Sequence, residues 1–200
     1  MSGLKKFSFD ASNNVNAMYE VKGFRTKFES TRGITFDTTA GTYDNGLTGV
    51  VEVTATKVGR GKTEISVYAD QDGDGRFVET FELDVVSSAG YRTENYKFDL
   101  SGDTVVTAYE QSKRGWKIDR VDYDEEYSVV VVGDETFVLK TENEWRGVEF
   151  DIFVDRDNDG LWSKIADGES MDAYLTADGQ VDLVGLVTDG FLAAADAITV

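Results

Sequence analysis

The chain has 200 residues, and its 38 acidic and 20 basic side chains give a formal net charge of −18. This charge repels phosphate backbones and anionic membranes, which argues against nucleic acid as a partner. Cys and His are both absent, which excludes disulfides, zinc sites, thiolate catalysis and imidazole acid–base chemistry. No apolar run is long enough to span a membrane, so we expect no transmembrane segment.

Short stretches of strand-forming residues, separated by Gly, Asn and Asp, follow one another along most of the chain. In the first half they predict strands near 4–10, 15–22, 24–29, 33–37, 49–57, 63–69 and 76–86. In the second half they predict strands near 95–99, 104–110, 116–123, 127–132, 135–141, 148–154 and 161–165. Long helical periodicities are scarce, so the sequence predicts an all-β protein.

The second half of the chain repeats the first. The matching segments are 7–10 with 96–99, 16–20 with 106–110, and 64–70 with 149–155. The offset between copies falls from 90 to 85 residues between the last two matches. The second copy has therefore lost about five residues, most simply in the loop around 38–45.

About seven short strands per copy are typical of a small β-sandwich. We therefore expect two tandem β-sandwich repeats, at 1–88 and 91–170, separated by a small-residue linker near 87–90. One continuous sandwich built from a duplication is the alternative. The remaining residues, 171–200, are expected to form a C-terminal β tail outside the repeat.

Each copy carries an acidic loop of the form D-x-D-x-D-G directly after a predicted strand, at 70–75 and at 155–160. Alternating carboxylates let one tight loop turn three oxygens toward a common centre, and glycine at the sixth position permits the sharp bend. The next backbone carbonyl can then point inward. Three carboxylates held together need a cation, and calcium accepts a crowded, flexible oxygen cage better than sodium or magnesium.

These loops differ from standard EF-hands, because strands flank them and Phe81 and Ala166 occupy the twelfth position, where a Glu is expected. Position thirteen is acidic in both copies, which makes it the first candidate for a remaining ligand. The predicted calcium ligands are Asp70, Asp72, Asp74, the carbonyl of Arg76 and Glu82 in the first copy, and Asp155, Asp157, Asp159, the carbonyl of Leu161 and Asp167 in the second. The alternative is a pair of polar turns without metal.

The end of the tail resembles the uncleaved C-terminal export signals of type I-secreted bacterial proteins. Leu192-Ala193-Ala194-Ala195-Asp196, followed by Ile198 and Val200, fits their Leu-x-Ala-x-Asp ending, although Ala197 stands where an aromatic is common. The resemblance implies an extracellular bacterial protein exported without a cleaved signal peptide. No apolar export segment follows Lys5 and Lys6, which agrees with that route. The alternative for this tail is a closing β-hairpin.

Two calcium loops in tandem β-repeats, with such a tail, are similar to the Rhizobium-adhering proteins. This resemblance implies cadherin-like domains and a secreted, calcium-dependent adhesion or polysaccharide-binding function. No motif marks a catalytic residue, so we expect a non-enzymatic protein. A structural subunit of an extracellular layer or fibre is the alternative, and a secreted effector or enzyme fragment is a third. Trp116, Trp145, Trp162 and Tyr123 are candidate sugar-stacking side chains that could equally be core.

Overall fold

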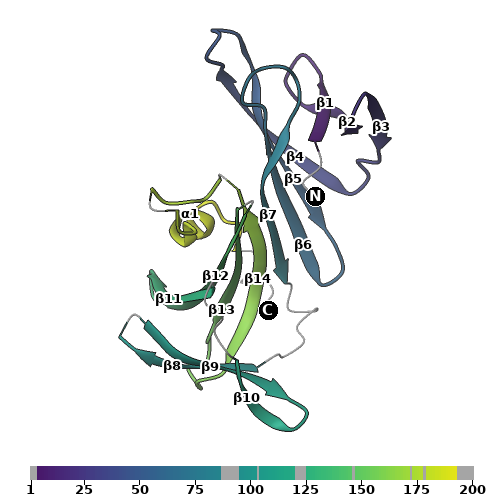
Figure 1. Ribbon diagram of the computed structural model, residues 1–200. Helices are drawn as coiled ribbons and strands as arrows, with labels where there is room; N and C mark the ends of the chain where they lie inside the picture. Colours follow the sequence, from purple (N-terminus) through teal and green to yellow (C-terminus); the bar gives the residue numbers. More distant parts are fainter. Residues whose placement is uncertain are drawn as a thin grey trace. The chain divides into compact units, whose positions relative to one another are not determined.

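A computed structural model of the protein describes residues 4–86, 95–102, 104–119, 125–145, 147–171, 173–177 and 179–192. Within these ranges the chain forms fourteen strands and one short helix (Figure 1), so the all-β prediction is confirmed. No helix in the described part is long and apolar enough to cross a membrane. The linker expected near 87–90, the candidate Tyr123 and the export-like ending after Leu192 lie outside the described residues.

Each predicted strand has a counterpart in the structure. The first seven are β1 (Leu4–Phe9), β2 (Val15–Lys22), β3 (Arg25–Glu29), β4 (Ile34–Thr42), β5 (Thr48–Val58), β6 (Lys62–Ala69) and β7 (Val78–Val86). The second seven are β8 (Asn95–Ser101), β9 (Thr104–Ser112), β10 (Gly115–Asp119), β11 (Glu125–Val132), β12 (Glu135–Glu144), β13 (Gly147–Val154) and β14 (Trp162–Ser170). The largest differences are at the ends of β4 and β14, which run five residues beyond the predicted strands.

Contacts divide the chain into two compact units. The first comprises Met1–Gly59 and Thr63–Glu82, and the second comprises Arg60–Lys62 and Leu83–Val200. The division therefore passes through β7, a few residues before the expected linker.

The first unit has two layers that share an aromatic core. Strands β1, β2 and β3 form one antiparallel sheet. Strands β4, β5 and β6 form an antiparallel ladder that continues to β7, where buried Thr80 donates to the Val67 carbonyl. Phe7 from the first layer meets Phe77 edge to face, with ring centroids 5.1 Å apart, and both contact the cluster around Val53. Burial of such rings dominates core energetics.

The second unit contains a closed ring of paired strands. The pairings run β8–β9–β11–β12–β13–β14 and return to β8, where Trp162 lies opposite Tyr96. Strand β10 adds to the outer side of β9. The core inside holds Phe98, Phe153 and Val138 with the Trp162 ring. This closed ring differs from the open sandwich that seven strands per copy led us to expect.

Strand register shows how the two copies correspond. Phe7 lies opposite Met18, and Phe98 lies opposite Ala108. Met18 and Ala108 are 90 residues apart, so the structural counterpart of Phe7 is Phe98, 91 residues on. The sequence match paired Phe7 with Tyr96 instead and is therefore wrong by two residues at this strand. The repeat elsewhere keeps its predicted offset.

The described part of the tail differs from the predicted β tail. Its β content is one isolated bridge, Leu175 with Val181, and α1 (Leu183–Thr188) follows. The Asp182 carboxylate accepts the Gly185 N–H at 2.9 Å at the start of this helix. Leu183 and Leu186 lie three residues apart and are both buried. A helical turn places side chains at this spacing on the same face, so both leucines can be buried together. Their burial therefore favours a helical turn over a strand in this segment.

Candidate metal centres

Both acidic loops lie at the same place in the repeat, between the last two strands of each copy. The first follows β6 and leads to β7, and the second follows β13 and leads to β14. In each loop the three predicted carboxylates offer oxygen atoms that all lie within 4.8 Å of one another. The structure thus brings together Asp70, Asp72 and Asp74 in one loop and Asp155, Asp157 and Asp159 in the other.

Backbone hydrogen bonds to the first carboxylate bend the first loop. The two carboxylate oxygens of Asp70 accept the N–H groups of Gly73 at 2.9 Å and Gly75 at 3.0 Å. Asp74 accepts the Arg76 N–H at 2.7 Å. Gly73 and Gly75 have φ of 75° and 77°, a conformation that side chains with a Cβ rarely adopt. The D-x-D-x-D-G spacing therefore encodes both the turn and its acceptors.

The second loop is also bent by its first and third carboxylates, but with a partly different set of backbone donors. Asp155 accepts the N–H groups of Asp159 at 3.2 Å and Gly160 at 3.0 Å. Asp159 accepts the Leu161 N–H at 2.7 Å. Asn158 takes the place of Gly73 and has φ of 55°, which Asn tolerates better than most residues. The two loops therefore share positive φ at their fourth and sixth positions, although one of the two backbone donors to the first carboxylate differs.

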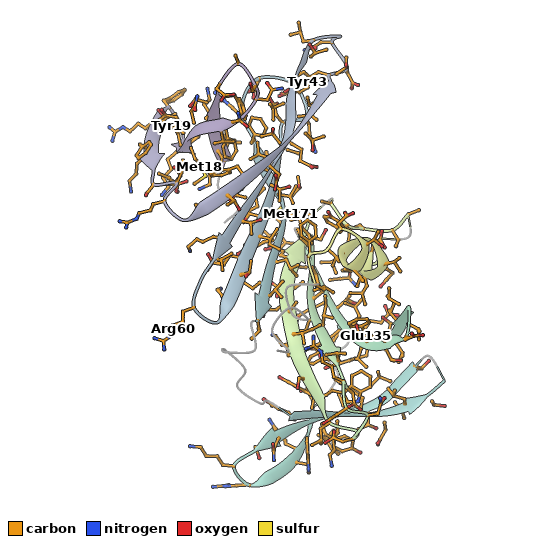
Figure 2. All side chains as sticks on the ribbon, turned by 180° about the vertical axis from the view of Figure 1, so that it is seen from behind. Met18, Tyr19, Tyr43, Arg60, Glu135 and Met171 are labelled. Atoms are coloured by element: carbon orange, nitrogen blue, oxygen red, sulfur yellow. The ribbon has the colours of Figure 1, made fainter. Side chains whose placement is uncertain are left out.

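A tyrosine covers the first loop. Tyr43 stands at the end of the β4–β5 hairpin (Figure 2), and its hydroxyl lies 2.6 Å from the Val50 carbonyl and 3.3 Å from Asp70 Oδ2. Asp70 is only 3% exposed. Burial, with the nearby charge of Asp70 and the hydrogen bond to it, raises the pKa of Tyr43. Sequence reasoning missed Tyr43, although it lies in the segment around 38–45 that the second copy shortens.

The shorter hairpin of the second copy brings acids to the second loop. Asp134 and Glu135 lie at the β11–β12 turn and at the start of β12, and Glu135 is labelled in Figure 2. They line a pocket with Asp155, Arg156 and Asn158. These two acids therefore share a pocket with Asp155, the first carboxylate of the second triad.

The two position-thirteen acids lie outside the triads. Glu82 is exposed on β7. Asp167 lies on β14 opposite Asp151, which precedes Asp155 by four residues or roughly 13 Å of strand. Asp167 instead contacts Lys164 at 3.5 Å. Burial raises the pKa of Asp167; Lys164 opposes the rise, and Asp151 and Asp84 add to it.

Repulsion among the carboxylates makes each triad electrostatically unfavourable without a cation. Two unit charges 4.8 Å apart repel by about 0.9 kcal/mol in water and about 3.5 kcal/mol at an effective dielectric of 20. Each triad contains three such pairs. Arg76 offsets part of the first triad, since its Nε lies 3.5 Å from Asp74 Oδ2. A divalent cation would neutralise the remainder.

The candidate stacking aromatics have separate roles. Trp162 is 6% exposed and packs edge to face on Phe98, with ring centroids 5.6 Å apart, so it is a core residue. Trp116 is 39% exposed on β10, with Lys97 Nζ 4.3 Å from its ring centroid. Trp145 is 81% exposed. Among the candidates that the structure describes, Trp116 and Trp145 are the exposed ones.

Comparison with protein families, curated proteins and solved structures found no match for this chain. The function must therefore be inferred from the chemistry of the two loops. Their side-chain donors are carboxylate oxygens, and hard cations such as calcium and magnesium prefer such ligands.

Proposed function

We propose that this protein binds one calcium ion in each acidic loop, that calcium stabilises its fold, and that it acts outside the cell as a calcium-dependent adhesion or polysaccharide-binding protein. The observation that carries the proposal is the recurrence of the same triad, 85 residues apart, with oxygens within 4.8 Å in both copies. A single acidic turn would be ordinary, but a duplicated one with a conformation in common favours a shared ligand.

The triad carboxylates accept hydrogen bonds that shape the loop and still have lone pairs left to bind a metal ion. An ionised carboxylate offers about four lone-pair positions. Asp70 accepts two backbone N–H groups and Asp72 accepts one, from Asp74 at 3.2 Å. Calcium takes six to eight oxygens in flexible geometry, whereas magnesium requires a near-ideal octahedron. Backbone carbonyls and water would complete the first site, and Asp134 and Glu135 could contribute to the second.

Calcium outside the cell is concentrated enough to fill weak sites of this kind. Extracellular modules bind calcium with dissociation constants of about 10⁻⁴ to 10⁻³ M. At about 2 mM calcium and an affinity of about 0.1 mM, binding adds about 1.8 kcal/mol of stability per site. This is a large share of the stability of a small domain. The resemblance of the loops and tail to type I-secreted adhesion proteins such as the Rhizobium-adhering proteins, with their cadherin-like domains, supports the extracellular part of the proposal.

A structural subunit of an extracellular layer or fibre is the second candidate. Strands β3 and β10 each stand at the end of a described sheet path. End strands present unpaired backbone groups to which another chain can add. Assembly that needs calcium but no glycan would favour this candidate over adhesion.

Calorimetric titration with calcium tests the metal sites directly. We expect two bound ions in the unaltered protein, one in Asp72→Asn or Asp157→Asn, and none in the double variant. The same titration with magnesium should give much weaker binding. Two bound ions in the double variant, or none in the unaltered protein, would contradict the proposal. Retention on immobilised acidic polysaccharide in calcium, but not in chelator, then tests the adhesion part.

A further inference from the structure

Six basic side chains of this acidic protein lie at two hairpin tips. Residues 22–27 read Lys-Gly-Phe-Arg-Thr-Lys, and residues 112–117 read Ser-Lys-Arg-Gly-Trp-Lys. These twelve residues contain six of the chain's 20 basic side chains and none of its 38 acidic ones. We call the two segments the basic tips. Each carries a local charge of +3 in a chain whose net charge is −18.

The basic tips occupy the same position in the repeat. Lys22 lies opposite Arg25, so the β2–β3 hairpin turns through two residues. Ser112 lies opposite Gly115, so the β9–β10 hairpin also turns through two residues. The two closing pairs are 90 residues apart, the offset of the repeat at these strands. Both copies therefore present a cationic tip at an equivalent hairpin, although the individual residues differ.

Large apolar side chains stand beside these cations in solvent. Every residue from 22 to 28 and from 111 to 118 is exposed. Phe24 is fully exposed at the first turn, and Phe28 is 61% exposed on β3. On β10, Trp116 is 39% and Ile118 is 57% exposed. Exposed apolar groups that cluster with one sign of charge mark an interaction surface.

We propose that each basic tip, by itself, docks onto a bilayer surface that contains anionic phospholipid. Basic side chains next to aromatic and aliphatic ones form the pattern of proteins that lie at a membrane interface, where cations meet headgroups and apolar groups enter the acyl boundary. Phe24 at a free tip and aliphatic Ile118 are suited to such insertion. A sugar platform would instead need flat aromatic faces with polar neighbours, and Ile118 contributes nothing to it.

The acidity of the rest of the chain does not prevent this docking. Interactions between exposed charges are largely screened beyond about 8 Å at physiological ionic strength. Glu20 lies 2.9 Å from Lys22 Nζ and offsets one cation of the first tip. Carboxylates beyond the screening length act only weakly on a membrane at a tip, where the remaining local cations dominate. The docking does not rest on the proposed calcium function, and a test in chelator separates the two, because it removes calcium bridges between carboxylates and headgroups.

The experiment is co-sedimentation of the full chain with sucrose-loaded vesicles in chelator at physiological ionic strength, where the acidity of the rest of the chain is screened. Vesicles of phosphatidylcholine with phosphatidylglycerol are compared with phosphatidylcholine alone. The variants are Phe24→Ser with Arg25→Ser, and Trp116→Ser with Arg114→Ser. Val58→Ser with Arg60→Ser is the matched control, since it removes one exposed apolar and one basic side chain at the β5–β6 turn, where Figure 2 shows Arg60.

We expect binding to anionic but not to neutral vesicles. Loss of one cation and one aromatic should weaken the affinity by about tenfold in each tip variant, with no such loss in the control. Circular dichroism melts confirm that all variants fold. No sedimentation of the unaltered protein, or equal binding by a variant with both tips changed, would overturn the proposal. Equal affinity of the tips for soluble alginate would also overturn it, because the surface would then recognise a polyanion in solution.

Discussion

Asp72→Asn should change the sign of its effect on stability when calcium is added. Asp72 is exposed and lies within 4.8 Å of both Asp70 and Asp74. Asp72 accepts the Asp74 N–H at 3.2 Å through one oxygen, which Asn keeps. The substitution therefore removes charge while it preserves the shape of the loop.

The magnitude follows from the distances. Two carboxylate pairs at 4.8 Å repel by about 0.9 kcal/mol each in water, and salt at physiological strength reduces the sum to about 1 kcal/mol. Asp72→Asn should therefore raise the free energy of unfolding by up to about 1 kcal/mol in chelator. In about 2 mM calcium the unaltered protein gains about 1.8 kcal/mol that the variant lacks, so the variant becomes the less stable form.

Urea unfolding followed by circular dichroism, in chelator and in calcium, measures both differences. Asp157→Asn is the matched variant in the second loop, and the double variant should lose the calcium effect entirely. An equal calcium-induced gain in Asp72→Asn and in the unaltered protein would refute the assignment of the ion to this loop. A destabilised Asp72→Asn in chelator would refute the repulsion estimate, because no charge would then be relieved.

The remaining predictions concern single side chains and are measured by the same unfolding and calcium titrations. Asp70→Asn should cost about 2 kcal/mol even in chelator, because this buried carboxylate accepts two backbone N–H groups. Glu82→Gln and Asp167→Asn should leave calcium affinity unchanged. Asp167→Asn should also stabilise the fold near pH 7 but not near pH 3. The raised pKa of Asp167 means that folding is penalised when this carboxyl is ionised. The penalty on stability is therefore present above the pKa in the folded state and absent below the pKa in the unfolded state. The gain should stay below about 1 kcal/mol, since the side chain is 44% exposed. Trp162→Ala should cost about 3–5 kcal/mol, and Trp145→Ala under about 1 kcal/mol.

The acidic triads were predictable because all their determinants are local. Three carboxylates at alternate positions and a glycine at the sixth position set both the backbone turn and the convergence of the side chains within six residues. Contributions from other elements were not predictable in this way. Tyr43 reaches Asp70 across 27 residues, and Asp134 and Glu135 reach the second loop from another hairpin. Sequence reasoning looked instead for the next acid along the chain.

The helix in the tail shows the limit of local propensity. Its residues, Leu-Val-Gly-Leu-Val-Thr, include two valines and a glycine, which are poor helix formers. The sequence analysis expected a β tail in this region. Burial of Leu183 and Leu186 outweighs that preference, because two apolar side chains removed from water contribute more than the propensity difference costs.

The sequence by itself determined the class of the protein, the positions of its strands, the duplication and the two acidic loops. These features depend on residues close together in the chain: period-two alternation, turn residues and carboxylate spacing. Only the tertiary structure decided which strands pair, because a pairing depends on contacts between distant segments that no local pattern records. The closed ring of the second unit, the register that matches Phe7 to Phe98, and the partners brought to each loop are all of this kind.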